Sequence, residues 1–68
     1  MNTLELARKL AELNQTEDAQ RAYFLALQEA NGNDPEVELE AASFLFFSGG
    51  NYQTAYTTFV SLYNRGYF

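Results

Sequence analysis

Apolar residues recur along this chain at spacings of three and four, the period of an amphipathic helix, in four separate segments. This pattern predicts helices over about residues 3–13, 17–31, 35–48 and 52–64. Polar residues and glycines separate the segments, at Asn14-Gln15, Gly32, Gly49-Gly50 and Gly66. Because the intervening links are short, neighbouring helices are expected to run antiparallel.

Residues that commonly cap helices stand just before each segment. Asn2, Asp34 and Asn51 are predicted to be N-caps of the first, third and fourth helices, and Thr16 is predicted to cap the second. Pro35 fits the first position of the third helix, where its missing N–H costs nothing.

The third segment has two contrasting halves. Glu36, Glu38 and Glu40 occupy the first half, where they are expected to form a solvated N-terminal turn favoured by the helix dipole. The stretch from Ala41 to Phe47 is apolar almost all round. A helix of this kind is expected to be covered on more than one side.

An internal repeat runs through the chain. A shift of thirty-six residues pairs similar residues: Ala7 with Ser43, Leu10 with Phe46, Ala19 with Ala55, Tyr23 with Phe59, and Ala26 with Leu62. Small residues let two helix axes approach, and a nearby aromatic ring fills the adjoining groove. The repeat predicts one domain, 1–68, made of two units at about 2–33 and 34–68.

The pattern resembles the tetratricopeptide repeat family over nearly the whole chain. The residues that carry the resemblance are Leu6-Ala7, Leu10, Ala19, Tyr23 and Ala26-Leu27 in the first unit, and Ala42-Ser43, Phe46, Gly50-Asn51-Tyr52, Ala55, Phe59 and Leu62-Tyr63 in the second. The chain departs from the family in its slightly longer period and in having no tryptophan in the first helix. The resemblance implies an all-α fold in which two antiparallel helix-turn-helix hairpins stack as a short right-handed α-solenoid.

The resemblance also implies a protein-interaction scaffold and not an enzyme, because members of the family bind a peptide or a helix in a groove lined by the first helix of each hairpin. The implied groove residues are Glu5, Arg8, Glu12, Val37, Glu40, Phe44 and Phe47. Phe44 and Phe47 are either an apolar anchor for the partner or part of the core. Some members hold a terminal carboxylate with asparagines, but Glu5 and Ala41 stand at those places here. An acidic C-terminal tail is therefore not the expected ligand.

A second aromatic surface is predicted on the last helix. It comprises Tyr52, Tyr56, Phe59, Val60 and Tyr63, with Tyr67 and Phe68 beyond them. In a stacked array a further helix covers part of such a surface, and otherwise an exposed apolar patch marks an interface. Two explanations remain open. Either the chain is a fragment of a longer protein, such as the non-catalytic N-terminal segment of a larger enzyme, or it forms a homo-oligomer through its last helix.

Composition narrows the expected partners and chemistry. Nine carboxylates face four cations, for a net charge of −5, which disfavours nucleic acid and anionic membranes and favours a neutral or basic protein or peptide. The chain has no histidine and no cysteine, so no catalytic residue, metal site or cofactor is expected. Its lack of cysteine and of a secretory signal is compatible with the cytoplasm.

Overall fold

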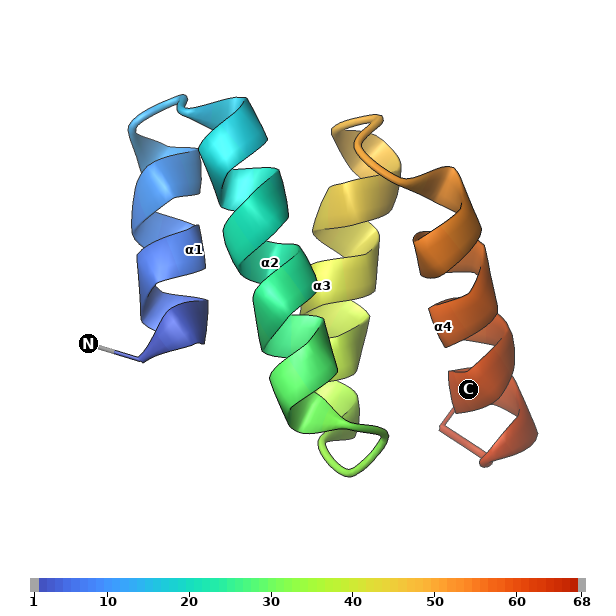
Figure 1. The fold of residues 1–68 in the computed structure, drawn as a ribbon. Coiled ribbons are helices and arrows are strands. Elements are labelled where there is room, and N and C mark those ends of the chain that lie inside the picture. The colour runs from blue at the N-terminus through green and yellow to red at the C-terminus, as the bar shows by residue number, and fades with distance from the viewer. Residues whose placement is uncertain (1, 68) are drawn as a thin grey trace.

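Four helices make up the part of the chain that the computed structural model describes, residues 2–67. They are α1 (Thr3–Glu12), α2 (Thr16–Ala30), α3 (Pro35–Phe47) and α4 (Tyr52–Asn64). Each lies within one residue of its predicted bounds. Consecutive helices run antiparallel and pack side by side in chain order (Figure 1). The fold is therefore all-α, a stack of the hairpins α1–α2 and α3–α4.

Three of the four predicted N-caps are confirmed. The side-chain oxygens of Asn2, Asp34 and Asn51 each accept the backbone N–H three residues later, at 2.8, 3.4 and 3.0 Å. The prediction for Thr16 is wrong: Thr16 is already the first residue of α2, and Gln15 stands at the cap without a side-chain hydrogen bond. The second helix therefore begins without the side-chain cap that the other three possess.

Buried alanines form the places where the helices approach each other. Ala7, Ala22 and Ala41 gather around Tyr23 in one buried cluster between α1, α2 and α3. A second cluster joins α3 to α4 and consists of Ala42, Leu45 and Ala55. Leu27 of α2 packs against both clusters. The prediction that α3 is covered on two sides is confirmed, since α2 and α4 flank it (Figure 1).

The structure corrects the repeat offset in the first helix of each hairpin. The backbone N–H of Gln15 donates to the carbonyl of Leu10, and that of Gly50 donates to the carbonyl of Leu45, both at 3.0 Å. These equivalent bonds lie thirty-five residues apart, from 15 to 50 and from 10 to 45. Leu10 therefore corresponds to Leu45 and not to Phe46, which is largely exposed.

The same correction moves the equivalent of Ala7. It is the fully buried Ala42, thirty-five residues on, and not the half-buried Ser43. The second helices keep the offset of thirty-six, because the turn after α3 is one residue longer than the turn after α1. Asn14 and Gly49 occupy the equivalent left-handed position in these turns, with φ of 60° and 75°, which asparagine and glycine adopt most readily.

The prediction of a solvated turn at the start of α3 is wrong for two of its three glutamates. Glu36 is exposed, as predicted. Glu38 is only 4% exposed, and Glu40 is half-buried against Arg8. A buried carboxylate needs partners, and both of these glutamates find a cation far away along the chain.

Arg65, just after α4, supplies the partner of Glu38. Its Nη2 lies 2.5 Å from Oε1 of Glu38, and its Nη1 donates to the carbonyl oxygen of Gly32 at 2.6 Å. The backbone N–H of Asp34 donates to the other oxygen of Glu38, at 3.1 Å. The end of α4 is thereby held against the link between the two hairpins.

Candidate functional site

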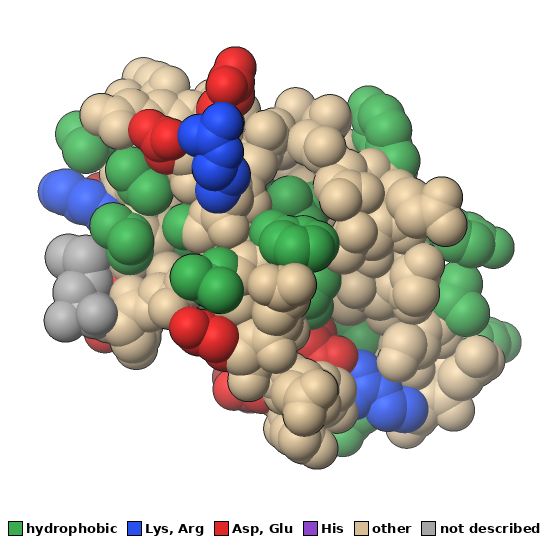
Figure 2. Space-filling model, in the orientation of Figure 1, with side chains coloured by type: hydrophobic (Ala, Val, Ile, Leu, Met, Phe, Trp, Pro, Cys, Tyr) green, Lys and Arg blue, Asp and Glu red, His purple; other side chains and the backbone are tan. Residues whose placement is uncertain are grey.

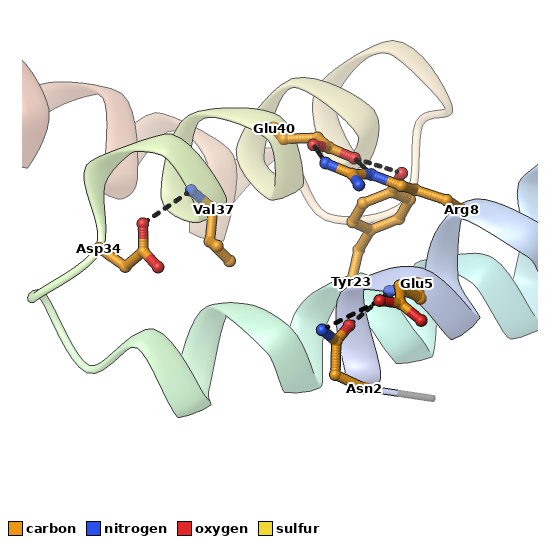
Figure 3. A network of polar contacts seen from close by, with 7 residues as sticks. All are labelled: Asn2, Glu5, Arg8, Tyr23, Asp34, Val37 and Glu40. Atoms are coloured by element: carbon orange, nitrogen blue, oxygen red, sulfur yellow. Dashed lines mark hydrogen bonds and ion pairs between the residues drawn. The ribbon is translucent and has the colours of Figure 1, made fainter.

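The α1/α3 face comprises the seven residues that the sequence assigns to the groove: Glu5, Arg8, Glu12, Val37, Glu40, Phe44 and Phe47. Its centre is a polar cluster (Figure 3), in which Arg8 from α1 and Tyr23 from α2 converge on Glu40 of α3. Arg8 makes two bonds to the Glu40 carboxylate, from Nε at 2.8 Å and from Nη2 at 2.6 Å. The Tyr23 hydroxyl donates to the same carboxylate at 3.0 Å.

The electrostatics of this cluster keep each group in its ordinary protonation state near neutral pH. The hydrogen bond from Arg8 lowers the pKa of Glu40, and the same bond raises the pKa of Arg8. Burial, followed by the bond to Glu40, raises the pKa of Tyr23 to about 12. General acid–base catalysts have pKa values near the working pH. At neutral pH Arg8 and Glu40 are therefore charged and Tyr23 is neutral, and their hydrogen bonds hold α1, α2 and α3 together.

The two phenylalanines of the α1/α3 face have different surroundings. Phe44 is half-buried and stacks on Tyr23, with ring centroids 4.6 Å apart and planes at 27°. Phe47, at the end of α3, is 83% exposed and meets Phe46 edge to face. The core interpretation thus fits Phe44, while most of the Phe47 side chain is open to solvent.

The remaining residues of the α1/α3 face interact locally. Glu5 pairs with Asn2 in the first turn of α1, and Glu12 lies 3.8 Å from Lys9 on the same helix. Val37 is half-buried beside a shallow hollow of about 230 Å³. The structure thus brings together Arg8, Glu40 and Phe44, around Tyr23. It leaves two accessible carboxylates on α1.

Tyr23 is the residue of this cluster that sequence reasoning missed as a polar contact. Periodicity identifies it correctly as a core aromatic, and it is 4% exposed. Its hydroxyl bond depends on where α3 comes to lie, which periodicity does not report. The sequence nevertheless contains one indication that the hydroxyl has a partner. The equivalent residue of the second unit is Phe59, so the core position itself does not require a hydroxyl.

The α4 aromatic face, defined as Tyr52, Tyr56, Val60 and Tyr63, is the most exposed apolar surface of the last helix. Its three tyrosines are 61%, 71% and 68% exposed. Hydrophobic side chains line the edge of the molecule that α4 forms (Figure 2). Phe59, predicted to belong here, is half-buried and meets Phe46 edge to face, while Phe68 lies outside the described residues. The whole of α4 carries no charged residue.

A further apolar surface lies at the opposite end of the stack. The α1/α2 groove is an open hollow of about 360 Å³ lined by Leu6, Leu10, Ala22 and Leu25, with Asp18 and Arg21 among the other residues around it. Leu6 and Leu25 are both largely exposed, and the view in Figure 2 shows hydrophobic side chains over these two helices. Sequence reasoning did not assign this groove a role. The one indication of the groove in the sequence is Leu25, an apolar residue that lies outside the core face of α2.

Other kinds of site find no support among residues 2–67. No group of three or more acidic, histidine or cysteine side chains in this range is arranged to hold a metal ion. None of the helices there combines the length and apolarity needed to cross a membrane. Comparisons of the chain with protein-family models, with curated proteins and with solved structures found no match.

Proposed function

We propose that this chain is a protein-interaction scaffold of the tetratricopeptide type, which binds a protein or peptide on its α1/α3 face and performs no catalysis. The observation that carries the proposal is the 83% exposure of Phe47 on that face. Exposed apolar side chains that adjoin one another mark interaction sites, and Phe47 contacts Phe46, which is itself 44% exposed. The cysteine-free composition is compatible with the reducing cytoplasm, the expected location.

The charges of the α1/α3 face favour a partner that is neutral or basic. Arg8 is the one cation among the seven residues of the face, and two hydrogen bonds already join it to the Glu40 carboxylate. Glu5 and Glu12 are exposed on α1, so they are accessible to a lysine or arginine of the partner. An apolar side chain next to this lysine or arginine of the partner would then pack on Phe47. Complementary charges of this kind mainly set specificity and the rate of association.

A displayed library of random peptides, selected on the immobilised chain, tests this proposal. We expect enriched sequences to combine a basic residue with an apolar one. Phe47→Ala should weaken their binding at least tenfold, because it removes the anchor. Tyr67→Ala is the matched control, an exposed aromatic outside the face, and should leave binding unchanged.

Glu5→Lys tests the charge component separately. Its side chain is exposed, and its bond to Asn2 is long at 3.5 Å, so the fold should tolerate the change. We expect peptides with basic residues to bind it more weakly than neutral peptides do. A selection that enriches nothing, or peptides that bind Phe47→Ala as tightly as the unaltered chain, would overturn the proposed function.

A further inference from the structure

The side of α2 that receives α3 has an equivalent on α4. Gln20 of α2 donates from Nε2 to the hydroxyl of Ser48, just after α3, at 2.9 Å. Phe24, one turn further along α2, lines a hollow that α3 also borders. The offset of thirty-six puts Tyr56 at the place of Gln20, and Val60 at the place of Phe24. Two residues of the α4 aromatic face therefore occupy positions at which α2 borders the following hairpin.

The side of α3 that packs on α2 has an equivalent on α1. The offset of thirty-five in the first helices puts Leu13 at the place of Ser48 and Leu6 at the place of Ala41. Ala41 is fully buried in the cluster that α2 and α3 share. Leu13, by contrast, is 54% exposed, and Leu6 lines the open α1/α2 groove. The N-terminal end of the stack thus presents apolar side chains where a preceding hairpin would lie.

We propose that a second copy of this chain docks the N-terminal end of its stack, the α1/α2 groove together with Leu13, onto the α4 aromatic face, repeating between molecules the contact that joins the two hairpins within one molecule. Tyr56 of one copy meets Leu13 of the next, as Gln20 meets Ser48. The proposal shares with the proposed function the idea of an interaction module. It uses two surfaces that are separate from the α1/α3 face.

Charge is compatible with this arrangement. The α4 aromatic face contributes no charged group, since its helix has none. Asp18 and Arg21, both beside the α1/α2 groove, already pair with each other at 3.0 Å, so docking leaves neither without a partner. Each copy carries a net charge of −5, and the copies therefore repel at low ionic strength. Self-association should strengthen as salt screens this repulsion.

The geometry also determines the kind of assembly. The two docking surfaces differ, so the contact is heterologous and adds copies in an open series instead of closing a symmetric dimer. At roughly 200 Å² per tyrosine, the α4 aromatic face offers about 450 Å² of exposed surface. The total area that two such surfaces would bury is smaller than the roughly 1,200 Å² buried in stable protein–protein complexes. We therefore expect monomers at low micromolar concentration and a series of oligomers near millimolar concentration.

Sedimentation velocity of two single-face variants provides the test. Tyr56→Lys places a charge on the α4 aromatic face, and Leu13→Lys places the same charge at the other docking surface. Gln28→Lys is the control, an exposed position on α2 with the same change in net charge. Far-UV circular dichroism verifies that each variant folds. If either does not, Tyr63→Lys or Leu6→Lys replaces it.

The unaltered chain and Gln28→Lys should associate, while each single-face variant alone should bind itself at least tenfold more weakly. An equimolar mixture of Tyr56→Lys and Leu13→Lys should form one-to-one dimers and nothing larger, because each supplies the surface that the other lacks. A monomeric unaltered chain near millimolar concentration would overturn the proposal. So would a monomeric mixture, or Leu13→Lys associating as well as the unaltered chain, which indicates an α4–α4 dimer. Peptide selection reports on the α1/α3 face independently of all these outcomes.

Discussion

Replacing Arg65 should destabilise this fold more than replacing any of the cations whose side chains are more than half exposed. Arg65→Met removes the guanidinium that binds Glu38 at 2.5 Å and the carbonyl of Gly32 at 2.6 Å. The Glu38 side chain is 5% exposed and would lose the cation that pairs with it. Removing one partner of a buried ion pair typically costs about 3–5 kcal/mol. Because Asp34 still donates to Glu38 and the Arg65 side chain is 30% exposed, we expect about 2–3 kcal/mol.

That loss is large for a chain of this length. Domains have a free energy of unfolding of roughly 0.05–0.15 kcal/mol per residue, which gives about 3–10 kcal/mol for 68 residues. Each kcal/mol corresponds to roughly 4–8 °C in a domain of this size, so the midpoint of thermal unfolding should fall by about 8–24 °C. Urea unfolding followed by circular dichroism measures the free energy directly.

Arg21→Met is the matched control for this measurement. Arg21 also pairs with carboxylates, Asp18 at 3.0 Å and Glu17 at 4.0 Å, but its side chain is 74% exposed. Its loss should cost at most about 1 kcal/mol. The double variant Arg65→Met/Glu38→Met should recover at least about 1 kcal/mol relative to Arg65→Met, since it no longer buries an unpaired charge. Equal losses for Arg65→Met and Arg21→Met would refute the reasoning.

Three further predictions concern the polar cluster and the second turn. Because the pKa of Tyr23 is raised to about 12, the hydrogen bond of its hydroxyl stabilises the fold below pH 10 and is lost as pH rises through 12. Tyrosinate absorbance should show one late step that Tyr23→Phe lacks, and a late step that survives this change would contradict the assignment. Because Arg8 lowers the pKa of Glu40, the pair stabilises the fold above pH 4.5, and this stabilisation is lost as pH falls below that value. Arg8→Met should therefore reduce the dependence of the unfolding free energy on pH in the acid range, and an unchanged dependence would count against the pair. A Cβ at Gly50 would lie 2.6 Å from the Gln20 side chain, so Gly50→Ala should displace that side chain and cost about 1 kcal/mol of stability through its lost bond to Ser48. This cost should vanish in a Gln20→Ala background, as urea unfolding of the unaltered chain, the two single variants and the double variant would show.

The features predicted well from the sequence are those encoded within a few residues. Asp34 and Asn51 cap their helices through bonds that span three positions, so residue type and local position suffice. The second helix shows the limit of this reasoning, because a threonine at 16 suits a cap but the helix already includes it. The backbone N–H of Gln15 donates to the carbonyl of Leu10, and Gln15, not Thr16, stands at the cap.

Features that depend on distant contacts were predicted less well. The pairing of Ala7 with Ser43 failed because one extra residue in the second turn changes the offset between hairpins, and either offset pairs small residues with small ones. The prediction of a solvated Glu38 is wrong because its partner, Arg65, lies twenty-seven positions away. Nothing in a helical period connects two such residues. The α1/α3 cluster has the same origin, since Arg8 and Glu40 are thirty-two positions apart.

The position of Leu27 against both core clusters has a consequence for how the protein unfolds. One cluster contains four buried residues and the other contains three, so neither cluster is large. A stack in which each helix touches only its neighbours would be able to lose one hairpin and keep the other. Leu27 belongs to the packing of both hairpins, so opening either one exposes its side chain. Leu27 therefore adds to the contacts that Ala41 and Glu40 make with the first hairpin, and the chain should lose its structure in one cooperative transition.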